Sequence, residues 1–369
     1  MRYRLALTSA ALLAAVSLAG ASSRAPFSQD GPIPLLAYYY IWFDPGSWDR
    51  AKSDLPLLGS YSSGDAEVMR QHVRWAKDAG IEGFIVSWKR TDALNARLES
   101  LVTIASEEDF QLAIIYQGLD FERDPLPVER VAADLTWFEQ TFGDHPVFQL
   151  FGKPLVIWSG TWEFSDEDIA LAASQLEGQI LLLASERQVE DYEQVAGWVD
   201  GNAYYWSSVD PFDTPRYQEK LTAMGETIHR DGGLWIAPAA PGFDARLIGG
   251  SRVVERKDGE TLRRQMATAF ASAPDAIGLI SWNEFSENSH VEPSRNYGTR
   301  YLEVLAEVRG GQAPDVPGFD SDQPSETVSS IGVARLAPFL LLGSLIIGSL
   351  AILALRRVQG PARRGDGKE

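Results

Sequence analysis

The feature that most restricts the fold of this chain is an alternation of short apolar runs and helical patterns, repeated eight times between residues 34 and 309. Each apolar run is four to eight residues long, which is typical of parallel strands covered on both faces. The runs occupy residues 35–42, 83–88, 112–116, 155–158, 180–184, 201–206, 234–238 and 276–282.

Helical patterns lie between these runs, and local signals mark where some of them begin and end. Gly80 predicts a left-handed backbone conformation at the end of the first helix. Ser165 and Asp168 predict a capping box at the start of the fourth helix. The strong patterns cover residues 65–79, 93–106, 128–142 and 166–176, and the weaker ones cover residues 192–199, 215–229, 260–271 and 300–309.

Eight strand–helix repeats predict an α/β fold, a (β/α)8 TIM barrel that occupies residues 30–309. A doubly wound open sheet is the alternative. The sequence disfavours it, because no G-x-G-x-x-G motif follows the first strand.

Both ends of the chain have the character of targeting segments. Residues 1–21 predict a secretory signal peptide, with two arginines, an apolar stretch and a small-residue cleavage site. Residues 336–355 contain no charged side chain and predict one transmembrane helix, and the basic residues 356–369 predict a cytoplasmic tail. Residues 310–335 predict a flexible stalk, so we expect a cell-membrane protein whose barrel lies outside the cytoplasm.

Composition narrows the chemistry. A net charge of −18 opposes binding to phosphate backbones, so nucleic acid is not an expected partner. The absence of cysteine excludes disulfides, thiolate metal sites and a cysteine nucleophile. The four histidines show no metal-ligand spacing, and we therefore expect neither a metal site nor a cofactor.

Aromatic and polar residues gather where the predicted strands end, and in a barrel these positions build the active site. The chain has 11 Trp and 12 Tyr residues. Because flat aromatic rings stack on sugars and polar side chains bind hydroxyl groups, the pattern favours an oligosaccharide or polysaccharide ligand. The expected binding residues are Tyr39, Trp42, Trp88, Tyr204, Tyr205, Asp244, Trp282, Asn283 and Glu292.

The sharpest signal is a pair of carboxylates three residues apart, Glu284 and Glu287, directly after the eighth apolar run. Glycoside hydrolysis needs two carboxyl groups, one to protonate the leaving oxygen and one to act as base or nucleophile. Two acids in one cleft also push their pKa values apart, which gives them different roles. We therefore expect Glu284 and Glu287 to be the catalytic residues.

Several segments are similar to glycoside hydrolase family 99, the endo-α-mannosidases and their relatives. They are the tyrosine-rich first strand with Trp42, residues 75–81 (WAKDAGI), residues 83–88 (GFIVSW), residues 241–244 (PGFD) and the Trp-Asn-Glu-x-x-Glu-x-x-x-x-Glu-Pro stretch over residues 282–293. The resemblance implies a (β/α)8 barrel that hydrolyses α-mannosides with retention and without a metal.

The resemblance also implies a role for each glutamate. Glu284 assists the sugar 2-hydroxyl as it attacks its own anomeric carbon to give an epoxide-like intermediate, and Glu287 acts first as acid and then as base. Related α-glucanases of family 71 share the general pattern, so α-glucan is an alternative substrate. Two further alternatives are a non-catalytic glycan-binding or envelope-assembly barrel and a transglycosylase.

Overall fold

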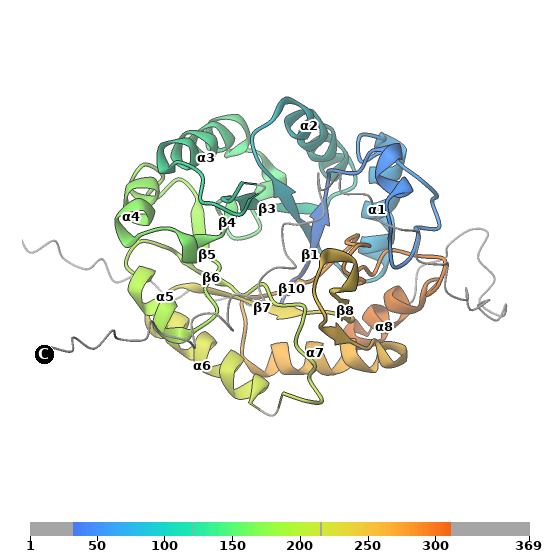
Figure 1. Cartoon of the computed structure of the whole chain (residues 1–369). Coiled ribbons are helices and arrows are strands. Elements are labelled where there is room, and N and C mark those ends of the chain that lie inside the picture. Colours follow the sequence, from blue (N-terminus) through green and yellow to red (C-terminus); the bar gives the residue numbers. More distant parts are fainter. Residues whose placement is uncertain (1–31, 121, 215, 311–369) are drawn as a thin grey trace, which may run out of the picture.

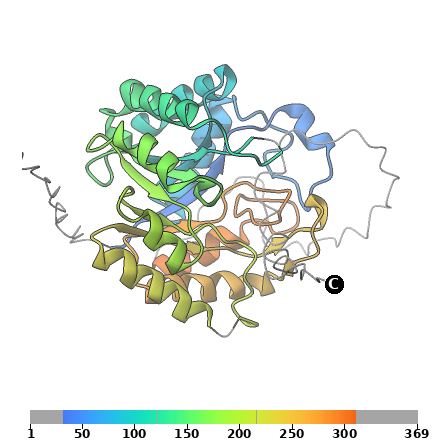
Figure 2. The same ribbon diagram turned by 60° about the vertical axis from the view of Figure 1, so that its left-hand side comes forward.

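The computed structural model describes residues 32–120, 122–214 and 216–310. Within these residues, eight parallel strands close into a barrel in the order β1-β10-β7-β6-β5-β4-β3-β2. Figure 1 looks along the barrel, with the helices in a ring around the strands, and Figure 2 shows the same two layers from the side. The predicted TIM barrel is confirmed, and the open-sheet alternative is wrong.

The expected signal peptide, transmembrane helix and tail lie outside the described residues, as does the stalk except for Gly310. In the part of the chain that the structure describes, no helix is both long and apolar enough to cross a membrane.

Each of the eight barrel strands precedes a helix that packs outside the barrel, and α8 follows the last strand, β10. The barrel strands are β1 (Leu35–Tyr40), β2 (Gly83–Trp88), β3 (Gln111–Gln117), β4 (Leu155–Ser159), β5 (Leu181–Ala184), β6 (Gly201–Ala203), β7 (Leu234–Ala239) and β10 (Ala276–Leu279). The helices are α1 (Ala66–Asp78), α2 (Asp92–Glu107), α3 (Val128–Phe142), α4 (Asp166–Ser174), α5 (Val189–Val195), α6 (Tyr217–Arg230), α7 (Glu260–Ala271) and α8 (Arg300–Arg309).

Local signals account for most element boundaries. Gly80 has a left-handed φ of +82° just after α1, and Ser165 with Asp168 forms the expected capping box at the start of α4. The fifth helix begins three residues earlier than its pattern predicts and ends at Val195. Tyr192 and Val195 form its buried face, whereas Trp198, which the pattern includes, lies beyond the helix and is 50% exposed.

Side chains alternate along the strands between the barrel interior and the layer that faces the helices. On β1, Leu36 and Tyr38 point inward, whereas Ala37 and Tyr39 pack toward the helices. On β2, Ile85 points inward, whereas the outward side chains are Phe84, Val86 and Trp88. This two-residue period decides which strand-end residues can reach a ligand.

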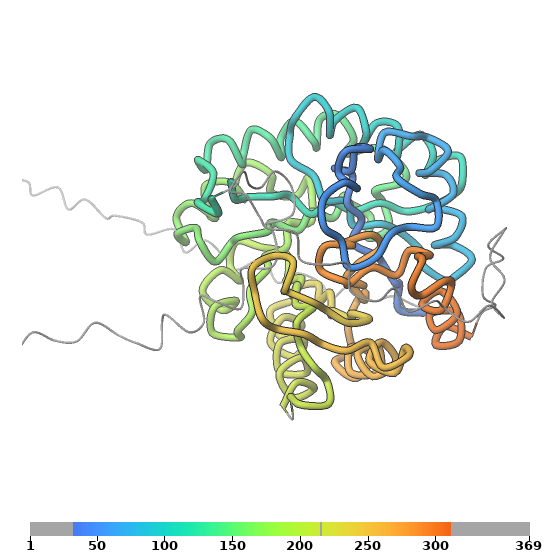
Figure 3. Tube along the Cα trace, turned by 45° about the vertical axis from the view of Figure 1, so that its right-hand side comes forward, coloured from blue at the N-terminus to red at the C-terminus, as the bar shows by residue number. Residues whose placement is uncertain are grey.

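Two segments cover the end of the barrel where the strands finish. One is a short hairpin formed by β8 (Phe243–Asp244) and β9 (Val253–Val254), which no sequence pattern announces because each strand has two residues. The other follows β1 and runs beside the segment after β10 in Figure 3, where Leu57 N–H donates to Pro293 O at 2.9 Å. Both segments therefore surround the residues that follow β10.

Candidate active site

The two glutamates lie on a tightly bonded loop that follows β10. Ser281 N–H donates to Ser289 O at 2.7 Å, so the loop closes on its own backbone. Glu284 N–H donates to Ser281 Oγ at 2.9 Å, and the hairpin adds a bond from Asp244 N–H to Glu287 O at 2.7 Å. The backbone that carries both carboxyl groups is thus fixed from inside the loop and from outside it.

Both glutamate side chains are buried, Glu284 with 3% and Glu287 with 1% of its surface exposed. Glu284 Oε1 accepts a hydrogen bond from Ser286 N–H at 2.9 Å. Glu287 Oε2 is buried and has no hydrogen-bond partner among the residues that the structure describes. A buried carboxyl oxygen without a partner is costly and calls for a functional explanation.

The surroundings raise the pKa of both carboxyl groups. Burial raises the pKa of Glu284 to about 7, opposed by hydrogen bonds from Ser286 and by the charge of Lys52. Burial and then the charge of Glu284 raise the pKa of Glu287 well above its usual value, with Arg123 opposing. Both carboxyl groups therefore hold their protons to higher pH than an exposed glutamate does.

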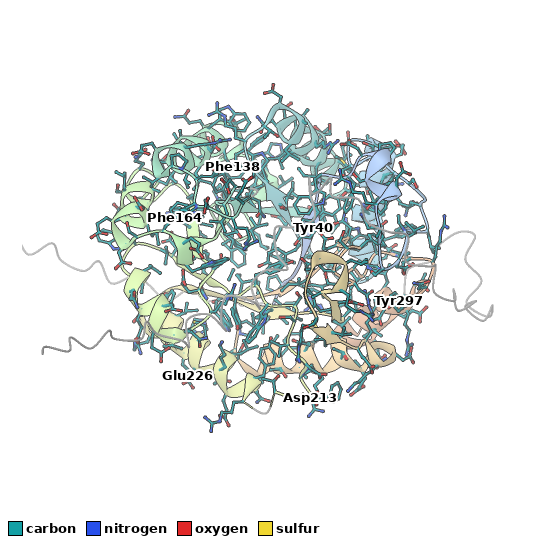
Figure 4. The ribbon with its side chains drawn as sticks, viewed as in Figure 1. Tyr40, Phe138, Phe164, Asp213, Glu226 and Tyr297 are labelled. Atoms are coloured by element: carbon teal, nitrogen blue, oxygen red, sulfur yellow. The ribbon has the colours of Figure 1, made fainter. Side chains whose placement is uncertain are left out.

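Two tyrosines from opposite sides of the barrel meet beside the glutamates. The hydroxyl groups of Tyr40, at the end of β1, and Tyr205, after β6, share a hydrogen bond of 2.6 Å. Burial, followed for Tyr205 by the interaction with Tyr40, raises the pKa of both tyrosines, and the charges of Glu287 and Glu284 add to the rise because they lie nearby. Figure 4 shows Tyr40 inside the ring of helices.

Sequence reasoning missed Tyr40 and two cations near the glutamates. Lys52 follows β1 and acts on Glu284, whereas Arg123 follows β3 and acts on Glu287. Both are half-buried. The sequence does give a signal for Tyr40, because it follows Tyr39, an expected binding residue, on the same strand. The two cations lie in loops without a motif, and no sequence signal singles them out.

The strand-end aromatic residues fall into two groups. Trp42 is half-buried, and its ring lies 4.5 Å from that of Tyr40, so Trp42 and Tyr205 accompany the glutamates. The other predicted aromatic residues are buried in the layer between barrel and helices: Tyr39, Trp88, Tyr204 and Trp282. Tyr39 and Trp88 lie on the outward side of their strands, and Tyr204 and Trp282, which follow strands, pack into the same layer. This placement assigns the four residues to the scaffold rather than to the cleft.

Contacts with neighbouring strands and helices hold these scaffold aromatics. Tyr39 stacks on Phe84 at 4.4 Å, and the Trp88 ring lies 5.9 Å from that of Trp137. Tyr204 carries the Lys220 ammonium 5.0 Å from its ring centre.

The three polar residues expected to bind substrate contact protein groups instead. Asn283 bonds to the backbone of Tyr40, and Glu292 accepts a hydrogen bond from Tyr61 at 2.8 Å. Asp244 pairs with Arg246, which lowers the pKa of its carboxyl group. Asn283 and Glu292 are buried, and Asp244 is partly exposed on the hairpin.

Across the described ranges, no group of three or more His, Asp or Glu side chains is arranged to hold a metal ion. The arrangement can perform acid–base chemistry with what it contains: two buried carboxyl groups with raised pKa values, and aromatic rings beside them.

Comparison with known proteins places this site in a family. Residues 44–306 match the sequence model for glycosyl hydrolase family 99. The mouse glycoprotein endo-alpha-1,2-mannosidase-like protein is 24% identical over 290 residues, and the rat glycoprotein endo-alpha-1,2-mannosidase is 21% identical over 284 residues. The matches cover 70% and 69% of this chain, and 62% and 60% of those relatives.

Solved structures share the fold. The family 99 endo-alpha-mannosidase from Bacteroides thetaiotaomicron, in complex with bis-tris-propane, superposes with a TM-score of 0.68 at 20% identity. It covers 76% of this chain and 97% of the bacterial one. A glycoside hydrolase-like protein gives a TM-score of 0.61 at 14% identity, over 78% and 97% of the two chains. Since the family match covers most of the barrel, this chain belongs to glycosyl hydrolase family 99.

Proposed function

We propose that this chain is a retaining glycoside hydrolase that cleaves α-mannosides with Glu284 and Glu287. One observation carries the proposal: two glutamates three residues apart are buried on one loop at the end of the barrel, and burial raises the pKa of both. The charge of Glu284 adds to the rise at Glu287. Such a pair supplies an acid and a base at neutral pH. The names of the mouse and rat relatives support α-mannosides as the substrate class.

The proposed reaction proceeds in two steps with the proton balance closed at each. First, Glu287 protonates the leaving oxygen while Glu284 takes the proton of the sugar 2-hydroxyl. The freed oxygen attacks the anomeric carbon, and the glycosidic bond breaks to leave an epoxide. Water then gives a proton to Glu287 and opens the epoxide at the same carbon, while Glu284 returns its proton to the 2-oxygen. Two inversions give net retention.

The test is digestion of a glycan panel by the purified full-length chain, with the product anomer followed by NMR. We expect release of products from α-mannosides with the α-anomer formed first. The double variant Glu284→Gln, Glu287→Gln is the matched control, because it keeps the side-chain shape without acid–base chemistry, and it should be inactive. Cleavage of α-glucans alone would replace the substrate class, and a first product of β configuration would refute retention.

The same proposal includes a location. We propose that residues 1–21 direct export, that residues 336–355 span the cell membrane once, and that residues 356–369 remain in the cytoplasm, so the barrel meets its glycans outside the cell. The charge-free stretch of 20 residues followed by arginines supports this topology.

A further inference from the structure

A buried chain of polar side chains lies behind the catalytic loop and does not face the carboxylates. Tyr61 O–H donates to Glu292 Oε2 at 2.8 Å, and Asn283 Nδ2–H donates to the Tyr61 oxygen at 3.3 Å. On the other side of Glu292, His72 Nε2 lies 3.1 Å from Oε1. All four side chains are at most 5% exposed, so their polar atoms contact one another rather than solvent.

At one end, this series of hydrogen bonds reaches Tyr40 on β1. Asn283 Oδ1 accepts from Tyr40 N–H at 2.9 Å, and Asn283 Nδ2–H donates to Tyr40 O at 3.0 Å. Asn283 therefore fixes two things at once, the backbone that leads directly into Glu284 and the residue whose hydroxyl group meets Tyr205. At its far end the chain reaches Tyr39, whose hydroxyl group bonds to His72 Nδ1 at 3.0 Å.

We propose that Tyr61 and Glu292 are positioning residues of the active site: together they hold the Asn283 amide in the orientation that places Glu284 and Tyr40. This inference rests on the proposed function. An amide side chain with two donors and one acceptor can rotate, and the Tyr61 oxygen supplies the partner that fixes the donor side. The Tyr61 oxygen is itself fixed, because its proton is committed to Glu292.

The alternative role for Glu292 is direct sugar binding. Its two oxygens face Tyr61 and His72, and 1% of its surface is exposed, which leaves no edge for a sugar hydroxyl. Each of the four side chains makes at least one hydrogen bond within this group or to Tyr39 and Tyr40, and such a network favours one arrangement of the loop. Because catalysis depends steeply on the placement of reacting groups, a small shift of the loop should lower kcat while substrate binding persists.

The experiment compares Tyr61→Phe with Tyr116→Phe in the full-length chain. Tyr116 offers a matched control, because its buried hydroxyl group also donates to a carboxylate, Asp134 Oδ2 at 3.0 Å, in the layer between β3 and α3. Each substitution removes one hydroxyl group and its hydrogen bond to a carboxylate, and Tyr61→Phe also removes the bond from Asn283 that the inference concerns. We expect Tyr61→Phe to lower kcat about 10- to 100-fold with KM within about twofold of wild type, and Tyr116→Phe to leave both unchanged.

Two variants of Glu292 test the hydrogen bond itself. Glu292→Gln keeps an acceptor for Tyr61 and should retain most of the kcat, whereas Glu292→Leu fills a similar space without one and should match Tyr61→Phe. Equal kcat in Tyr61→Phe and Tyr116→Phe would overturn the inference. So would a Gln variant as slow as the Leu variant, or a loss confined to KM.

A measurement that needs no turnover separates this inference from the proposed function. The Glu284 carboxyl carbon, labelled with ¹³C and assigned by its loss in Glu284→Gln, can be titrated by NMR. We expect its pKa to move in Tyr61→Phe and to keep the wild-type value in Tyr116→Phe. If the wild-type chain cleaves no glycan, the proposed function fails, and the titration alone decides on positioning: an unmoved pKa in Tyr61→Phe refutes it.

Discussion

At the scale of single residues, Glu284 and Glu287 are close in sequence and similarly buried, and the proposed reaction gives them different roles in proton transfer. Replacing either by Gln should lower kcat by at least about 100-fold, because an amide does not act as a general acid or base. A substrate with an activated leaving group needs little protonation. It should therefore partly restore the first step in Glu287→Gln and leave Glu284→Gln inactive.

Pre-steady-state release of a nitrophenol leaving group measures this first step in each variant. Wild-type turnover in both variants would show that neither glutamate is catalytic. Restoration in Glu284→Gln alone would exchange the two roles and leave the pair in place.

The pKa values of the pair also set the pH dependence. The proposed reaction requires Glu284 ionised and Glu287 protonated. As pH rises toward about 7, Glu284 loses its proton and kcat/KM should increase, and at higher pH Glu287 loses its proton and kcat/KM should fall. A profile of kcat/KM against pH checks this, and an optimum near pH 4 would mean that burial does not shift the pair.

Some residues of the candidate site were easier to predict from the sequence than others. The position of Glu284 and Glu287 at the end of the barrel was predictable, because both follow a buried apolar run directly, whereas their catalytic role stays a prediction. The choice between Tyr39 and Tyr40 was not, because the facing of a side chain depends on the register of the strand, and a one-residue error moves it to the opposite face.

At the scale of elements, the alternation along each strand makes two tryptophans behave differently. Trp42 is half-buried beside Tyr40, whereas Trp88 is 0% exposed between the barrel and the helices. Trp42→Ala should weaken glycan binding by about 1–3 kcal/mol, the scale of a large apolar contact. Trp88→Phe should lower the unfolding temperature and leave binding unchanged, because its ring packs against the helices.

Each tryptophan variant is combined with Glu287→Gln, which should be inactive. Isothermal titration with an oligomannoside then measures the free energy of binding, and thermal unfolding measures the unfolding temperature. Weakened binding in the Trp88 variant at a temperature where it is folded would contradict its assignment to the scaffold.

The barrel strands and their helices were predictable as elements, because buried parallel strands read as continuous apolar runs. Their ends were less so. The runs over residues 35–42 and 276–282 extend past β1 and β10, because the side chains stay buried after the strand ladder has stopped. The β8–β9 hairpin has too few residues for any period to be visible.

At the scale of the whole molecule, the sequence pattern of the two chain ends predicts an orientation. Protease added to intact cells should digest the barrel and leave a short membrane-bound fragment that contains residues 356–369, detected by a C-terminal tag. Cells made permeable before digestion provide the control, because the tag should then be lost as well. A barrel protected in intact cells would reverse or abolish the assigned topology.

The Asn283 amide described above also has a mechanical consequence, because it lies at the seam where the first and last barrel strands meet. The β1–β10 ladder stops at the pair Ala37 and Leu279, and the Asn283 side chain bonds to Tyr40 three residues farther along β1. Opening this seam separates the parts of the site. Activity and tryptophan fluorescence should therefore disappear at the same urea concentration, and an inactive form with an intact barrel should not accumulate before unfolding.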